Sequence, residues 1–148
     1  MKQKKLHAYQ TLLRMAQVRE LRASMALSEA SGEESACRSR LDAVKANRDA
    51  ICAADRNDPR NGQVDIGRYE MLSLLDAAFA ERQQLASDNL AGAIEVREER
   101  ANSNLLAKRY RERISEHVVQ LDQALHHEHA AKVQEDAIEL WLGGRGEP

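Results

Sequence analysis

A hydrophobic repeat runs along nearly the whole chain and breaks only once. From Leu6 to Ile51, alternate steps of three and four residues meet an apolar or small residue at all but three of fourteen positions. The three exceptions are Glu20, Glu34 and Arg48. A period of 3.5 residues keeps one stripe of a helix facing a partner helix along its length. The repeat therefore restricts this part of the chain to a long paired helix.

The break has the chemistry of a turn. Residues 57–62 read Asn-Asp-Pro-Arg-Asn-Gly, in which Pro59 cannot continue a helix and Asn61-Gly62 tolerates positive φ. The repeat then resumes at a second series of positions: Leu72, Leu75, Phe79, Ala86, Ala93, Val96, Ala107, Tyr110, Ile114, Leu121, Ala131, Ile138 and Leu142. The predicted fold is all-α, with two long helices forming an antiparallel coiled-coil hairpin in which the second helix is the longer.

The boundaries of these elements follow from capping residues. We expect one elongated unit over 1–148, with helix 1 over about 4–56, a turn over 57–67, helix 2 over about 68–142 and a frayed tail over 143–148. Asp65 is a suitable N-cap for helix 2, and Gly143-Gly144 resembles a helix C-cap. A compact bundle of three or four helices is the alternative, but it needs further turns that the sequence does not supply.

The heptad phases also suggest how the two helices align. With the turn centred between Asn61 and Gly62, Tyr9 faces Ile114, Val44 faces Phe79 and Glu34 faces Asn89. Registers shifted by one heptad in either direction stay open, and they place Glu34 opposite Arg82 or Val96. The pairing with Arg82 is electrostatically attractive. Arg48 then lies near the solvated turn, where reversal of its charge is expected to do little.

An unequal hairpin leaves part of helix 2 without a partner. In the predicted register Val119 is the last residue opposite helix 1, so that about 24 residues, 119–142, extend beyond it. An exposed apolar stripe on an isolated helix implies a binding partner. The residues predicted to contact that partner are Leu121, Leu125, Ile138, Trp141 and Leu142.

Small residues gather in the middle of the predicted hairpin. Gly32 and Gly92 would lie nearly opposite each other, which suggests a close approach of the helices or a local bend. A mechanical hinge is the functional alternative, since Gly costs about 1 kcal/mol inside a helix. Residues 31–34 could even break helix 1.

Charge and cysteine content favour a cytoplasmic protein that binds neither nucleic acid nor membrane. The formal net charge is -2, which creates no strong field toward either partner. Cys37 and Cys52 would lie about 22 Å apart on one helix, too far for a disulfide. Two unpaired thiols without a signal peptide indicate a reducing compartment, and no stretch is apolar enough to span a bilayer.

The sequence offers little catalytic chemistry. His126, His127 and His129, with Glu128 and the more distant His117, are the only group that resembles metal ligands, and one helix can present about two of them on one face. No Gly-rich phosphate loop follows a strand, and neither cysteine has a convincing His partner. We expect no enzymatic activity, no catalytic residues, no metal and no cofactor. The basic run 108–113 fits a solvated helix face, or alternatively a docking patch for an acidic partner.

The first helix resembles the opening of a known protein family. The run from Leu12 to Ala23, continuing to Leu27 and Ala30, has a leucine pair, an Arg-Glu step and then small residues and Leu at heptad spacing. This pattern is similar to that of the FliJ/YscO family, the cytoplasmic stalk proteins of type III secretion ATPases in flagella and injectisomes. After the turn, Arg68-Tyr69 and the apolar series from Leu72 resemble the start of the family's second helix.

The resemblance implies a function and a set of partners. Proteins of this family sit in the central hole of a hexameric ATPase, contact the export gate and recycle secretion chaperones at the inner membrane. Leu75 and Phe79 are the positions that fit the family's gate contact, whereas Arg82 and Ala86 depart from it, which favours the injectisome branch. The alternative function is a generic coiled-coil scaffold or a prefoldin-like holdase chaperone. A small helical protein that binds metal or nucleic acid is a third, weaker hypothesis.

Overall fold

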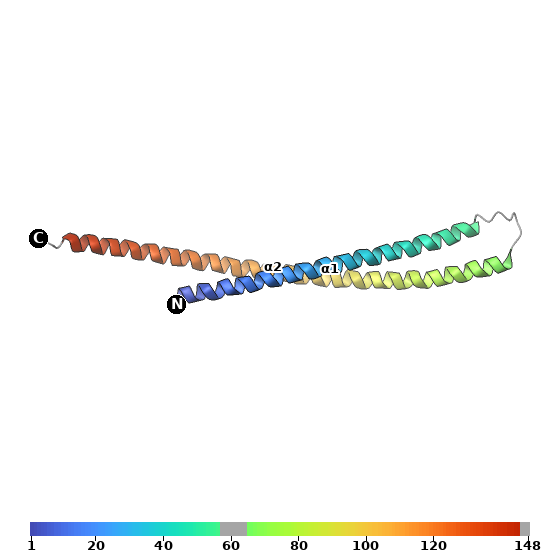
Figure 1. Cartoon of the computed structure of the whole chain (residues 1–148), viewed down its shortest axis with the longest axis horizontal. Coiled ribbons are helices and arrows are strands. Elements are labelled where there is room, and N and C mark those ends of the chain that lie inside the picture. Colours follow the sequence, from blue (N-terminus) through green and yellow to red (C-terminus); the bar gives the residue numbers. More distant parts are fainter. Residues whose placement is uncertain (57–64, 146–148) are drawn as a thin grey trace. The chain divides into compact units, whose positions relative to one another are not determined.

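The fold is all-α, as the repeat predicts. The computed structural model describes residues 1–56 and 65–145. Of these, all but Met1 and Asp65 lie in two helices, α1 (Lys2–Arg56) and α2 (Ile66–Arg145) (Figure 1). The two helices are antiparallel and pack against each other, and no strand occurs in the described ranges. The fold class of a helical hairpin is thereby confirmed.

The ends of α2 extend beyond the predicted bounds. Most of the predicted turn, residues 57–64, lies outside the described residues. Asp65 accepts a hydrogen bond from the backbone N–H of Arg68 at 3.3 Å, so it caps α2 as predicted, and the helix begins directly after it. At the other end α2 continues through Gly143 and Gly144, which were predicted to end it. There the guanidinium of Arg145 stacks on the ring of Trp141, with 4.1 Å between its central carbon and the ring centroid. The two residues are one helical turn apart, so this contact stabilises the last turn of α2.

The described residues divide into two compact units. The terminal unit pairs Met1–Ser24 of α1 with α2 from Ser103 to the C-terminus, and the inner unit comprises Met25–Asn102. In each unit a segment of α1 packs along a segment of α2. The core of each is thin, because its few buried residues are small or medium-sized and none of the described side chains is both large and completely buried. The buried residues are Ala16, Ala30, Cys37, Leu41, Ala93 and Ile114.

The residues of one helix that face the other are here called its seam. The seam of α1 consists of the predicted residues, whereas only one of the two predicted lines of seam residues on α2 is correct. All the buried residues of α1 belong to the repeat that starts at Leu6. On α2, the line through Leu72, Phe79 and Ala93 is buried or partly buried as predicted. The second line is displaced by one residue. The predicted Leu75, Val96 and Tyr110 are 37–45% exposed. The residue that follows each of them in the sequence is partly buried and lies in the seam instead. These neighbours are Asp76, Arg97 and Arg111.

The register differs accordingly from the predicted one. The Tyr9 ring lies against His117, with centroids 5.7 Å apart, one helical turn beyond the predicted partner Ile114. Glu34 pairs with Arg97 and not with Asn89. Each of these partners lies further along α2 than predicted. Charged side chains of α2 meet charges on α1 along this alignment, and the apolar pattern does not record such pairs.

Neither central glycine is required by close packing. A Cβ atom added at Gly32 or Gly92 would find no other atom within 4 Å. Residues 31–34 are helical, so α1 does not break there. The expectation of a close helix approach at these glycines is therefore wrong.

Candidate partner-binding surfaces

The pairing of α1 with α2 ends close to the N-terminus of α1. Lys2 forms an ion pair with Glu128, nine residues beyond the predicted last contact at Val119. Leu121 and Leu125, predicted to lie in the unpaired part of α2, are instead partly buried in the terminal unit. From His126 to Arg145 every residue is exposed. The unpaired part of α2, here called the C-terminal segment, therefore comprises residues 129–145.

The C-terminal segment exposes large apolar side chains over more than half of its circumference. Its large apolar side chains are 53–79% exposed, and they are Val133, Ile138, Leu140, Trp141 and Leu142. At 100° per residue these side chains and three alanines span an arc of about 200°, within which Gln134 and Arg145 also lie. A helix that packs on one neighbour needs an apolar stripe only about half as wide. The predicted contacts Ile138, Trp141 and Leu142 are thus available to a partner.

Three acidic residues lie in the remaining part of the circumference, together with Lys132 and His129. Glu135 and Glu139 lie one turn apart beside Leu142, and Asp136 lies at the opposite edge of the apolar arc, beside Leu140. The arc is therefore flanked by negative charge on both edges. A surface that covers it would be apolar at its centre and basic at its margins.

A shallow hollow marks the point where α1 begins beside α2. It has a volume of about 590 Å³, and its walls include Gln3, Leu125, His129 and Lys132. It is open to solvent because α1 supplies only its first turn there. The hollow is thus the junction of the paired helices with the C-terminal segment.

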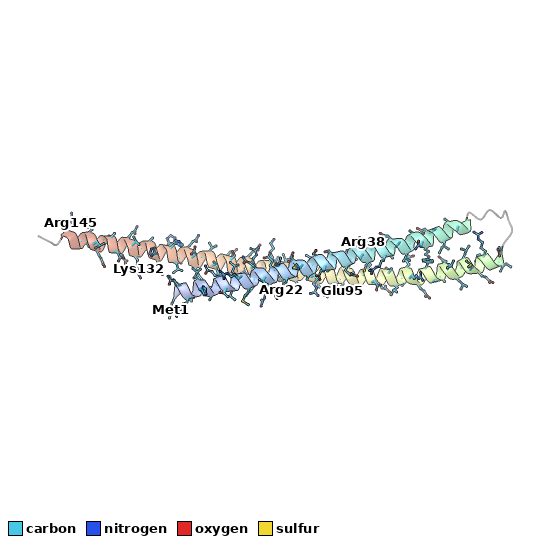
Figure 2. The ribbon with its side chains drawn as sticks, viewed as in Figure 1. Met1, Arg22, Arg38, Glu95, Lys132 and Arg145 are labelled. Carbon is cyan, nitrogen blue, oxygen red and sulfur yellow. The ribbon has the colours of Figure 1, made fainter. Side chains whose placement is uncertain are left out.

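The outer face of α1 in the terminal unit is a second candidate surface, which the sequence reasoning missed. Met15, Val18 and Arg22 follow one another at three- and four-residue spacing on the side of α1 opposite the seam (Arg22 is labelled in Figure 2). Leu12 and Arg19 lie on one flank of this line, and Arg14 and Leu21 on the other. The four apolar residues are 39–61% exposed. A second apolar line at helical spacing could have revealed this face, but the stronger seam repeat masks it.

The predicted gate residues have mixed accessibility. Leu75 is on the surface of the inner unit, at 37% exposure. Phe79 is partly buried in the seam, and the Arg82 guanidinium lies 5.4 Å from its ring centroid. Only Leu75 is therefore freely presented to a partner.

Charged side chains bridge the seam of both units. In the terminal unit Arg111 donates to Glu20, and in the inner unit Arg97 pairs with Glu34. Arg48 donates to Asp76 at 2.9 Å and to Gln83 at 3.3 Å. The hydrogen bond and charge of Asp76 raise the pKa of Arg48 above its ordinary value. Arg48 therefore bridges the two helices, which removes the reason for expecting that reversal of its charge does little.

The histidines do not converge on a metal site. The Nδ1 of His126 lies 2.9 Å from the backbone oxygen of Asp122, and its neighbours His127 and His129 point into solvent. Within residues 1–56 and 65–145, no three His, Cys, Asp or Glu side chains are arranged to hold a metal ion. Cys37 is buried, Cys52 is exposed, and both are free thiols.

Among the residues that the structure describes, neither helix contains a stretch long and apolar enough to cross a membrane.

Comparison with known proteins does not assign the chain to a family. No protein-family model matches the chain, and neither the curated proteins nor the solved structures contain a significant match.

Proposed function

We propose that this chain is a stalk protein of a type III secretion apparatus, which binds the hexameric secretion ATPase through the C-terminal segment. The observation that carries the proposal is the apolar arc of that segment, which α1 leaves uncovered. The resemblance of Leu12–Ala23 to the FliJ/YscO family supplies the identity of the partner. The chain would then act as a non-enzymatic component at the cytoplasmic side of the inner membrane.

The width of the arc favours an enclosing partner. An exposed arc of about 200° is wider than one neighbouring helix can cover. The central opening of an ATPase ring offers contacts on several sides, so it could cover Val133 and Leu140 together with Ile138 and Leu142. Burial of each large side chain contributes about 1.5–3 kcal/mol before the costs of association. Trp141 is the strongest candidate for an anchor, since aromatic residues dominate the energetics of such interfaces.

Contacts with the export gate and with secretion chaperones form the finer part of the proposal. Leu75 is exposed on the inner unit and fits a gate contact, while Phe79 is half-covered by Arg82. We expect Leu75 to contribute more than Phe79 if the gate binds there. The injectisome branch remains the favoured system, because Arg82 and Ala86 depart from the flagellar pattern.

A reconstitution experiment tests the ATPase contact. The purified chain is added to the secretion ATPase of its source cell, and binding and ATP turnover are measured. We expect the triple substitution I138D/W141A/L142D to weaken binding at least tenfold and to abolish any stimulation of turnover. The matched control is L85D, which places a charge at an equally exposed leucine of the inner unit. Full binding by the triple variant, or no binding by the unaltered chain, would refute the proposal. Suppression of client aggregation without an ATPase would favour the holdase alternative.

A further inference from the structure

The outer face of α1 carries more than the pairing with α2 requires. Counted in heptads from Leu6, the seam uses the first and fourth positions, while the second, third and sixth positions point away from α2. Outward positions of a two-stranded coiled coil meet water and are ordinarily polar. Between residues 14 and 22 they hold Arg14, Met15, Val18, Leu21 and Arg22. Large apolar side chains at these positions therefore indicate a contact other than the one with α2.

The rest of α1 follows the ordinary pattern. From residue 28 to residue 53 the same outward positions hold only Ala, Gly, Ser, Asp and Glu. Between residues 26 and 54 no large apolar side chain of α1 is exposed. The combination of apolar and basic side chains is thus confined to one stretch of the helix, as expected for a local binding surface.

This stretch lies in a strongly basic part of the chain. Residues 1–24 carry six Lys and Arg side chains and one carboxylate, whereas the rest of the chain carries 16 basic and 23 acidic residues. The formal net charge of -2 hides this separation. The one carboxylate, Glu20, is paired with Arg111 across the seam. Within the described residues Arg14, Arg19 and Arg22 form no ion pair, so their charge is available to a ligand.

We propose that the outer face of α1 binds the surface of an anionic lipid bilayer. Its apolar side chains would enter the headgroup region to a depth of about 5–10 Å, as those of interfacial helices do. The arginines beside them would lay their aliphatic stems along the lipid and bring their guanidinium groups to the phosphates. Because α2 packs on the opposite side of α1, it does not obstruct this contact.

The arrangement of charge favours a bilayer over an acidic protein or a nucleic acid. Arg22 continues the apolar line, and Arg14 and Arg19 lie on its two flanks, so cations surround the apolar side chains on several sides. An anionic bilayer offers phosphates at every point of its surface and needs no fixed match to these cations. Protein interfaces draw on Trp and Tyr, and residues 12–22 contain neither. A nucleic acid would place its phosphates against the apolar line as well as against the arginines.

Electrostatic attraction should determine which lipids are bound. Each Lys or Arg near an anionic surface strengthens binding about fivefold, so three arginines would favour anionic over neutral lipid by about 100-fold. The preference should fall as salt is added, because the screening length decreases from about 10 Å at 0.1 M to about 3 Å at 1 M.

Vesicle binding by the full chain alone, without any ATPase, tests this proposal separately from the proposed function. Vesicles of phosphatidylcholine with about 30% phosphatidylglycerol are compared with pure phosphatidylcholine vesicles by co-sedimentation. The partition coefficient should be about 100-fold higher on the anionic vesicles. On these vesicles R14Q/R19Q/R22Q should lower it by about 100-fold. M15Q/V18Q/L21Q, which leaves the charge unchanged, should lower it by at least about tenfold.

A matched control separates the location of charge from its amount. The variant K108Q/R109Q/R113Q removes the same charge from exposed positions of α2. These positions lie on the helix that faces away from the bilayer, about 8–10 Å further from it, where screening at 0.15 M salt is strong. The control should bind within about threefold of the unaltered chain. Circular dichroism should show the same helical content in all variants, since glutamine is a good helix former.

A fluorescent label can identify the face that contacts lipid. In a chain with Cys37→Ala and Cys52→Ala, an environment-sensitive dye attached through Val18→Cys should shift its emission to the blue on anionic vesicles. The same dye attached through Arg109→Cys should not shift.

Several results would overturn the proposal. These are equal partition onto both kinds of vesicle, loss of binding in the α2 control as large as in the arginine variant, and binding that does not change in M15Q/V18Q/L21Q. Retention on polyglutamate or duplex DNA without vesicle binding would also overturn it, and would assign the outer face to an acidic protein or a nucleic acid instead.

Discussion

Charged residues at two-heptad spacing on α1 form polar contacts with α2. Three positions of the α1 repeat are charged, each 14 residues from the next, and each meets a polar partner on α2. The pairs are Glu20 with Arg111, Glu34 with Arg97, and Arg48 with Gln83 and Asp76. The sign of the charge on α1 reverses at Arg48. A slip of two heptads could bring Glu34 to Arg111, but it would also bring Arg48 to Arg97, and this repulsion opposes the slip.

Reversal of the charge at Arg48 should therefore produce a mixture of registers. In Arg48→Glu the native register places the new carboxylate beside Asp76, whereas the slipped register offers it Arg97. Spin labels on exposed positions of the two helices should report a second distance population, with α2 displaced along α1 by about 21 Å. The labels require a background in which Cys37 and Cys52 are replaced.

The neutral variant Arg48→Gln is the control. It loses the ion pair without gaining one in the slipped register, so it should show one distance population and a lower urea midpoint. A single native distance in Arg48→Glu would contradict the role given to this residue.

The same residues explain how far the sequence could predict the seam. Apolar spacing identified the α1 seam and one line of α2, since hydrophobic side chains dominate both. The second line of α2 was missed because it mixes apolar residues such as Leu90 with the polar Asp76, Arg97 and Arg111, beside which stand apolar residues that a search for apolar positions selects instead. These are Leu75, Val96 and Tyr110. Single-residue displacements of this kind follow from pairwise charge contacts, which become visible only when both helices are placed.

At the scale of the helices, capping controls where α2 begins. Asp65 accepts a hydrogen bond from the N–H of Arg68, and its own backbone oxygen accepts one from Tyr69 at 3.0 Å. We expect Asp65→Ala to destabilise the first turn of α2 by about 1 kcal/mol, and Asp65→Asn to retain most of that stability. Hydrogen exchange at the amides of Arg68 and Tyr69 measures the effect. Unchanged protection in the alanine variant would exclude a capping role.

The central glycines test whether α1 and α2 need local flexibility. Since a Cβ atom at Gly32 or Gly92 would meet nothing within 4 Å, alanine should be tolerated at both positions. Gly32→Ala and Gly92→Ala should each stabilise the protein by about 0.5–1 kcal/mol in chemical unfolding, because alanine loses less backbone entropy in a helix. If ATPase binding fell in these stabilised variants, the hinge hypothesis would regain support. Destabilisation would instead reveal a packing demand that the structure does not show.

At the scale of the whole molecule, the unequal lengths of α1 and α2 leave one end of α2 unpaired. The sequence predicted that this unpaired end exists, but not the residue at which it begins. The existence of an unpaired end of α2 followed from one turn and two unequal repeats. The residue at which the unpaired end begins could not be predicted in this way. It is set by the last pair between the helices, Lys2 with Glu128, and that pair depends on the register. Leu121 and Leu125, which were predicted to bind a partner, consequently lie in the paired part of α2 and are partly buried. Ile138, Trp141 and Leu142 are exposed, as predicted.

The C-terminal segment should be the least stable helical part of the isolated chain. An isolated helix of about 12–15 residues is marginal in water, and all 17 residues of 129–145 are exposed. Hydrogen exchange should show protection near the global free energy of unfolding around Ile114 and little protection beyond Lys132. Deletion of 129–148 should therefore shift the thermal midpoint by less than about 2 °C, in line with the small effect of removing exposed residues. A large loss of stability would mean that the segment packs on the rest of its own molecule. That result would remove the free apolar arc on which a partner depends.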